Sequence, residues 1–409
     1  MGNTPNIRFK GFDEDWEQRK LGNLTTYRNG TGHEEKQSDV GKYELVNLNS
    51  ISIDGGLKPS GKFIDEETET LIKDDLVMVL SDVGHGDLLG RVAIIPENNR
   101  FVLNQRVALL RNNGFADTKY LFSYINAHQR YFKLQGAGSS QLNISRGSVE
   151  NFEVLLPKRD EQKQIGECFS NLDHLITLHQ RKCQETKKLK EYMLQKMFPK
   201  KGEKIPEIRF EGFTGDWEQR KLGELSSSFE YGLNAAAKAY DGENKYIRIT
   251  DIDDDSREFK QEDITSPDTD LSSAENYKLS EGDILFARTG ASVGKSYIYK
   301  ASDGLVYYAG FLIRASIKPE YNSEFVFQNT LTDRYNKYIA VTSQRSGQPG
   351  VNAQEYAEFE IKVPKKEEQT KIGTYFRNID HLITLHQRKL EKLKKVKKSL
   401  LEHMFPTEK

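Results

Sequence analysis

The chain has few cysteines and no long apolar run. Only two of its 409 residues are cysteines, Cys168 and Cys183, and both fall within one predicted helix. That number excludes a disulfide framework, argues against a zinc site and fits a reducing cytoplasm. No apolar run approaches the ~18–20 residues of a membrane span, and the polar N-terminus lacks a signal-peptide core. We therefore expect a cytoplasmic protein without membrane contact, whose cysteines are small core or seam residues.

Net charge is also nearly absent. The chain carries a formal charge of −1, so it is not a uniformly basic nucleic-acid binder. Charge is nevertheless uneven: residues 371–398 are strongly basic, and residues 251–270 are strongly acidic. Any contact with DNA must therefore be local. The acidic stretch must face solvent, a protein partner or a base edge that presents an amino donor.

Catalytic signatures are missing as well. The eleven prolines include no Pro-Pro pair, as a base-methylating loop would need, and the eight histidines show no His-Glu-x-x-His spacing. Residues 289–296 approach a nucleotide-binding loop, but Thr289 holds the first glycine position, and only three residues separate Gly290 from Gly294. The chain is therefore predicted to be non-catalytic and to hold no cofactor or metal. This loop is either a close approach to a DNA backbone or a plain turn.

Two stretches of the sequence occur twice. Residues 7–22 return almost unchanged as residues 208–223, and residues 173–182 return identically as residues 380–389. The segments between these blocks have little in common. One scaffold has been built twice with different inserts, which suits two related but unequal contacts along one extended ligand. The invariant surroundings of Trp16 and Trp217 favour core anchors over base-stacking platforms.

Each half ends in a predicted long helix. Residues 159–198 contain no proline and no glycine after Gly166, and they predict one helix of about 35–39 residues, which is ~55 Å long. Apolar residues of the second copy follow a heptad seam, and both copies stop at Met-Phe-Pro. The two helices are expected to form an antiparallel coiled coil. His179 and His386 would meet in its seam and fix the register; a metal pair is the weaker interpretation.

The inserts mix short strands and helices. Apolar runs at residues 76–80, 91–95 and 107–110 are separated by turn residues, and the second half repeats this style. The predicted fold class is therefore α+β, with two globular domains joined by two long antiparallel helices in a pseudo-twofold repeat.

Polar residues in the predicted turns are candidates for DNA contact, because Asn and Gln can pair with adenine and Arg with guanine. Ordinary exposed turns of the same composition are the alternative. The first-half candidates are Arg91, Asn104, Gln105, Arg106, Ser139, Ser140, Gln141 and Asn143. The second-half candidates are Arg288, Thr289, Ser292, Lys295, Tyr308, Gln344, Arg345, Ser346 and Gln348.

The order of these motifs resembles the specificity subunit of type I restriction–modification systems over the whole chain. The resemblance rests on the twice-occurring Trp-Glu-x-x-x-Leu-Gly opening, on residues 282–295, and on Asn104-Gln105-Arg106. It also rests on Glu-Gln-x-x-Ile leading into each long helix. The second half departs from it where Tyr308-Ala309-Gly310 is expected to match Asn104-Gln105-Arg106.

The resemblance implies two target-recognition domains, residues 1–157 and 208–364, each reading one half of a split double-stranded DNA target. Residues 158–199 and 365–409 would be the long helices that space the domains and dock two modification subunits, and residues 200–207 would be a linker. The modification subunits would bind S-adenosylmethionine, and restriction subunits would use ATP and Mg. Two other readings are a coiled-coil adaptor that does not bind DNA and a nucleotide-dependent enzyme.

Overall fold

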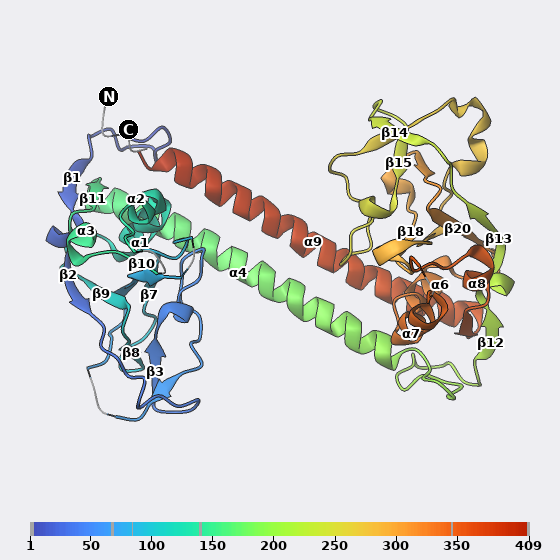
Figure 1. Cartoon of the computed structure of the whole chain (residues 1–409), viewed down its shortest axis with the longest axis horizontal. Coiled ribbons are helices and arrows are strands. Elements are labelled where there is room, and N and C mark those ends of the chain that lie inside the picture. Colours follow the sequence, from blue (N-terminus) through green and yellow to red (C-terminus); the bar gives the residue numbers. More distant parts are fainter. Residues whose placement is uncertain (1–3, 67–68, 84, 139–140, 345–346, 407–409) are drawn as a thin grey trace. The chain divides into compact units, whose positions relative to one another are not determined.

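The computed structural model describes residues 4–66, 69–83, 85–138, 141–344 and 347–406 (Figure 1). The chain divides into two compact units. The first consists of Met1–Leu178 and Leu390–Lys409, and the second consists of His179–Lys389. Each unit therefore contains the end of a long helix that begins in the other.

Among its described residues, the first unit has short strands, three short α-helices, the start of one long helix and the end of another. Its elements are β1 (Glu17–Lys20), β2 (Thr25–Asn29), β3 (Tyr43–Val46), β4 (Phe63–Ile64), β5 (Leu76–Val79), β6 (Ser81–Asp82), β7 (Val92–Ile94), β8 (Phe101–Leu103), β9 (Val107–Asn112), α1 (Thr118–Ala127), α2 (Gln129–Leu134), β10 (Leu142–Asn143), α3 (Arg146–Glu150), β11 (Glu153–Leu156) and α4 (Arg159–Lys196).

The second unit repeats this order with local differences. Its elements are β12 (Glu218–Lys221), α5 (Leu222–Leu225), β13 (Ser226–Tyr231), β14 (Ala236–Ala239), β15 (Lys245–Ile247), β16 (Thr265–Asp268), β17 (Ile284–Ala287), β18 (Ser296–Ile298), β19 (Val306–Tyr308), β20 (Leu312–Ile317), α6 (Ser323–Asn329), α7 (Asp333–Thr342), α8 (Ala353–Ala357), β21 (Glu360–Val363) and α9 (Lys366–Met404).

A four-stranded antiparallel sheet organises each unit. Its order is β2-β9-β5-β7 in the first unit and β13-β20-β17-β18 in the second. Alternate residues of a strand point to opposite faces. In β5, Leu76 and Met78 join the core beneath α1, whereas Val77 and Val79 pack against residues of the parallel pair β3–β8. Both faces of this sheet are therefore covered, which explains why its central strand is apolar throughout.

The repeated sequence blocks hold the base of each unit together. In the first unit, Arg8 makes a two-pronged ion pair with the fully buried Glu161 of α4, at 2.7 and 2.8 Å. Arg209 and Glu368 repeat this pair in the second unit with the same two distances. Because a buried carboxylate is stable only when it is paired, the arginine and the glutamate of this pair must recur together in the two halves. Trp16 is 2% exposed and packs edge-on against a tyrosine of α1, which confirms its role as a core anchor.

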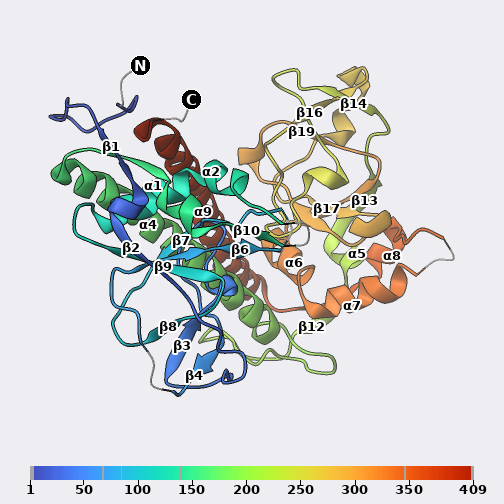
Figure 2. The same cartoon turned by 60° about the vertical axis from the view of Figure 1, so that its left-hand side comes forward.

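Each long helix ends in the core of the opposite half. Met404, the last residue of α9, and Phe405 lie in the first unit's core together with residues of α1. Figure 2 shows the C-terminal end of α9 near α1. Met197 and Phe198, at the end of α4, lie in the second unit's core with Trp217. The core of each globular part is thus completed by residues from the other half of the sequence.

Within each unit the two long helices run antiparallel, as predicted. In the second unit, His179 Nδ1 lies 3.0 Å from His386 Nδ1, and Lys190 forms a 2.6 Å ion pair with Asp380. Asp173 and Lys397 form the matching pair in the first unit at 2.5 Å. The helices contain 38 and 39 residues, so the α+β fold class and the two long helices are confirmed.

Candidate nucleic-acid interface

Three loops meet where the central strand β5 ends in the first unit. The N–H of Leu80 donates to the carbonyl of Arg106 at 2.9 Å, and the carbonyl of Leu80 accepts from the N–H of Ile144 at 2.9 Å. These bonds bring together the end of β5, the β8–β9 turn and the loop after α2. The end of β2 joins them at Gly30, where a Cβ atom would lie only 1.8 Å from the Asn104 carbonyl oxygen. We call this set of loops the recognition edge.

The second unit builds the same edge from the same backbone contacts. The N–H of Arg288 donates to the carbonyl of Phe311 at 3.1 Å, and its carbonyl accepts from the N–H of Val351 at 2.9 Å. Gly232 repeats the close approach, because a Cβ there would lie 2.2 Å from the Ala309 carbonyl oxygen. Arg288 therefore corresponds to Leu80, and Phe311 corresponds to Arg106.

The predicted polar residues of the first edge line its surface. Gln105 and Arg106 are exposed in the β8–β9 turn, and Asn143 is exposed in β10. Gln105 is hydrogen-bonded to Glu34, and Gln141 is hydrogen-bonded to the Ser81 hydroxyl. Arg106 has a φ of 67°, in the left-handed region that side-chain-bearing residues rarely adopt.

The second edge carries a matching glutamine. Asn143 pairs with Ser81 and Gly350 pairs with Thr289, so Gln348 occupies the position of Gln141. Gln348 and Gln344 are exposed, and Thr289 and Ser292 are half-buried. Four further predicted residues, Ser139, Ser140, Arg345 and Ser346, lie outside the described residues.

Arg91 and Lys295, both predicted to contact DNA, make contacts within their own units, and Lys295 is not exposed as expected. These two residues occupy matching positions before β7 and β18. Lys295 is only 8% exposed, and its Nζ lies 3.2 Å from the Ile252 carbonyl and 2.5 Å from Asp254. Arg91 is half-buried and donates to the Asn126 carbonyl at 3.1 Å, and this burial lowers the pKa of Arg91. Both cations therefore tie their own unit together.

Two further candidates lie below the surface. Tyr308 is fully buried and packs within the second core of its unit, and burial raises the pKa of its hydroxyl. Asn104 is 6% exposed. The predicted match of Asn104-Gln105-Arg106 with Tyr308-Ala309-Gly310 was also wrong by one residue. Thr31 pairs with Asn104, and Leu233 pairs with Ala309 at the equivalent place, so Asn104 corresponds to Ala309. The residue that takes the place of Arg106 is Phe311.

Two aromatic residues of the second edge were not anticipated from the sequence. Tyr231 is 44% exposed and Phe311 is 59% exposed, and the Arg288 guanidinium lies over both rings. Its carbon is 5.1 Å from the Tyr231 ring centre and 5.8 Å from the Phe311 ring centre. A correct alignment of the two turns in the sequence would have singled out Phe311, because Phe311 then stands at the position of the exposed Arg106.

Comparison with known proteins identifies the family. The family model described as type I restriction modification DNA specificity domain matches residues 13–188 and again residues 214–395. The chain belongs to this family.

Similar proteins agree with this assignment. The type I restriction enzyme MjaVIII specificity subunit of Methanocaldococcus jannaschii is 23% identical over 95% of this chain and 91% of its own length. The putative MjaX specificity subunit of the same organism is 25% identical over 95% of this chain and 92% of its own length. The crystal structure of a type I restriction–modification S subunit from M. genitalium has the same fold, with a TM-score of 0.73 and 18% identity, and covers 99% of this chain and 100% of its own.

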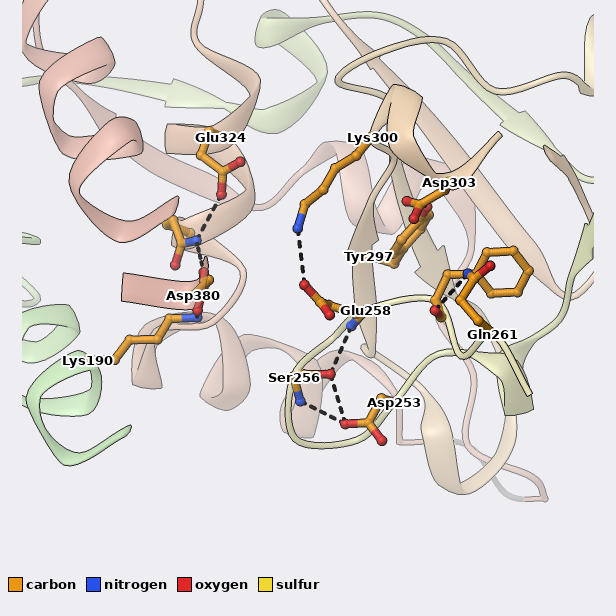
Figure 3. A network of polar contacts seen from close by, with 12 residues as sticks. Lys190, Asp253, Ser256, Glu258, Gln261, Tyr297, Lys300, Asp303, Glu324 and Asp380 are labelled. Carbon is orange, nitrogen blue, oxygen red and sulfur yellow. Dashed lines mark hydrogen bonds and ion pairs between the residues drawn. The ribbon is translucent and has the colours of Figure 1, made fainter. Parts of the chain in front are cut away.

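Several acids of the acidic stretch in the second specificity domain have partners within their own unit. Asp254 neutralises Lys295, and Lys295 lowers the pKa of Asp254. Asp253 accepts hydrogen bonds from the backbone and hydroxyl of Ser256, and Glu258 faces Lys300 at 3.4 Å, as Figure 3 shows. Asp253, Asp254 and Glu258 therefore help to hold this segment on its own unit.

A cavity of about 360 Å³ lies beside this segment, lined by residues of α6 and α9. Its carboxylates already have partners: Asp380 pairs with Lys190, and Glu324 accepts from Gln328 at 3.0 Å (Figure 3). Burial raises the pKa of Glu324. Across the described parts of this specificity-family chain, no group of three or more His, Cys, Asp or Glu residues could hold a metal ion. None of the helices in the described ranges is both long and apolar enough to cross a membrane.

Proposed function

We propose that the chain is the DNA sequence-recognition subunit of a type I restriction–modification enzyme and has no catalytic activity of its own. One observation carries this proposal: the recognition edge is built twice on the same backbone contacts but with different side chains. Two unlike edges on a duplicated frame suit a split double-stranded target, in which each unit reads one part. Sequence is read by side chains that reach base edges, whereas a shared backbone frame can set their position.

The long helices are proposed to dock two copies of one modification subunit. Residues 173–182 and 380–389 are identical, although several of their side chains are on the surface. Leu175 is 40% exposed and Leu382 is 45% exposed. Folding alone does not require exposed residues to be the same in both copies, but binding the same partner twice does. In this proposal S-adenosylmethionine belongs to the modification subunit, and ATP and Mg belong to restriction subunits.

Exchange of one recognition edge tests the function. Residues 25–150 would be replaced by the equivalent segment of a relative with another target, in the full chain co-produced with its modification partner. We expect the methylated sequence in cellular DNA to change in one half only. A change in both halves, or no change, would contradict independent reading by the two units.

Two controls separate the rival functions. If the intact chain with its partner shows no sequence preference for double-stranded DNA, the adaptor reading is favoured. Binding of ATP by the purified chain alone would instead favour the nucleotide-dependent enzyme.

A further inference from the structure

The two recognition edges carry an arginine and an apolar residue in exchanged positions. In the first unit the strand end carries Leu80 and the facing turn carries Arg106; in the second unit the strand end carries Arg288 and the turn carries Phe311. The linking hydrogen bond is the same, with N–O distances of 2.9 and 3.1 Å. Among the described residues of this backbone contact, each edge thus has one arginine, on opposite sides of the same hydrogen bond.

Arg288 is held in a fixed orientation. Two exposed rings, Tyr231 and Phe311, lie within 5.8 Å of its guanidinium carbon, so the cation is stacked on aromatic faces. The Nε–H group is buried and donates to no partner among the described residues. The described residues also offer Arg288 no carboxylate partner. The remaining donors are the two terminal nitrogens, which is the end of the group that pairs with two acceptors at once.

Arg106 reaches the same region by a different route. It is exposed at the tip of the β8–β9 turn, and its φ of 67° is unfavourable for a residue with a side chain. No described residue forms an ion pair with it. Strained residues that persist on an exposed turn occur most often where the side chain is needed.

We infer that Arg288 and Arg106 each read a guanine in the major groove, one in each half of the target. This inference rests on the proposed function. Guanine presents O6 and N7 as adjacent acceptors, which a planar guanidinium contacts with two parallel hydrogen bonds. A lysine cannot reproduce this geometry, because its ammonium is a point charge. Since the two arginines approach from opposite sides of the edge, the guanines occupy different positions within their half-targets.

The test uses the full chain in complex with its modification partner and a pool of randomised double-stranded DNA. Arg288→Ala should lower the preference for guanine over other bases at one position of the second half-target by about 5- to 150-fold. The first half-target should not change. Arg288→Lys keeps the charge and should still lose this preference. Arg106→Ala should act in the same way on the first half-target, and Arg220→Ala, an exposed arginine on β12, should change neither.

The possible outcomes distinguish a failure of this inference from a failure of the proposed function on which it rests. If Arg288→Lys binds as the wild type does, while Arg288→Ala weakens binding to every sequence and lowers the salt slope by about one, the contact is to phosphate and the inference is overturned. If the wild type is selective and both variants keep its preference, Arg288 is not a reading group. If the wild type itself shows no preference, the proposed function fails first. Thermal unfolding of each variant checks that the fold is retained.

Discussion

The first and second recognition edges differ in side chains, while the backbone hydrogen bonds that join their loops are the same. Both place a strand end between a turn and a closing loop, and both use a glycine where two backbones nearly touch. One edge has an arginine with positive φ on the turn, and the other has an arginine whose guanidinium lies over two aromatic rings. The comparison teaches that the side chains of an edge can change while the backbone hydrogen bonds that position the loops stay the same.

Beneath the edges, the two units share the same buried ion pair. The pairs Arg8–Glu161 and Arg209–Glu368 have the same geometry, and each is sealed in a similar core. Each core also depends on a helix end from the other half. Predictions that disturb the frame should therefore have larger effects than those that disturb an edge.

The largest effect is expected from Phe405→Ala. Phe405 is 3% exposed, and its ring centre lies 5.2 Å from that of Tyr124 and 5.5 Å from that of Phe169. Removing a buried ring costs about 3–5 kcal/mol of unfolding free energy. The loss should appear in the first unit, although the residue is near the C-terminus of the chain. Amide hydrogen exchange would show β5 and α1 opening first.

Phe198→Ala is the matched variant. Its ring centre lies 5.7 Å from that of Phe325, so it should destabilise the second unit and leave the first protected. If Phe405→Ala instead loosened mainly the second unit, the exchange of helix ends between the halves would be wrong.

An intermediate effect is expected from a charge on one of the repeated helical patches. Leu175→Glu should weaken binding of one modification subunit by roughly tenfold, since a charge in a buried contact costs about 1–2 kcal/mol or more. Leu382→Glu should do the same to the other copy. Each single variant should assemble with one partner and the double variant with none, as measured by native mass spectrometry. Lys188→Glu lies outside the repeated block and is the control; retained assembly of two partners by both leucine variants would refute this docking surface.

The frame shared by the two units could be predicted because the residues that form it occur twice in the sequence. Arg8, Trp16 and Glu161 each have a copy, and a periodic apolar seam marks both long helices. The recognition edges were harder to predict from the sequence. The turn containing Arg106 shares no letters with its counterpart, so only the strand pairing reveals that Phe311 takes its place.

Two features that depend on contacts between distant residues could not be predicted from the local sequence. Lys295 looked like an exposed basic residue beside a glycine-rich loop, but the acidic stretch folds over it and supplies Asp254 as a partner. The local sequence does not record such a contact across forty residues. Likewise, the pattern of α9 predicted a long helix but not that Phe405 would complete the first core.

The smallest effect, and the sharpest contrast between the edges, is expected from Arg106→Gly. Glycine adopts positive φ without steric cost, whereas other residues lose about 1–2 kcal/mol there. Part of this gain is offset by the greater freedom of glycine in the unfolded chain, so unfolding free energy should rise by up to about 1 kcal/mol. Phe311→Gly should bring no such gain, because Phe311 is not among the described residues with positive φ. Chemical denaturation measures both, and DNA selection shows whether Arg106→Gly has lost its half-target. A more stable protein with poorer recognition would mean that the strain at Arg106 is retained for reading DNA; a loss of stability would mean that the arginine supports the turn itself.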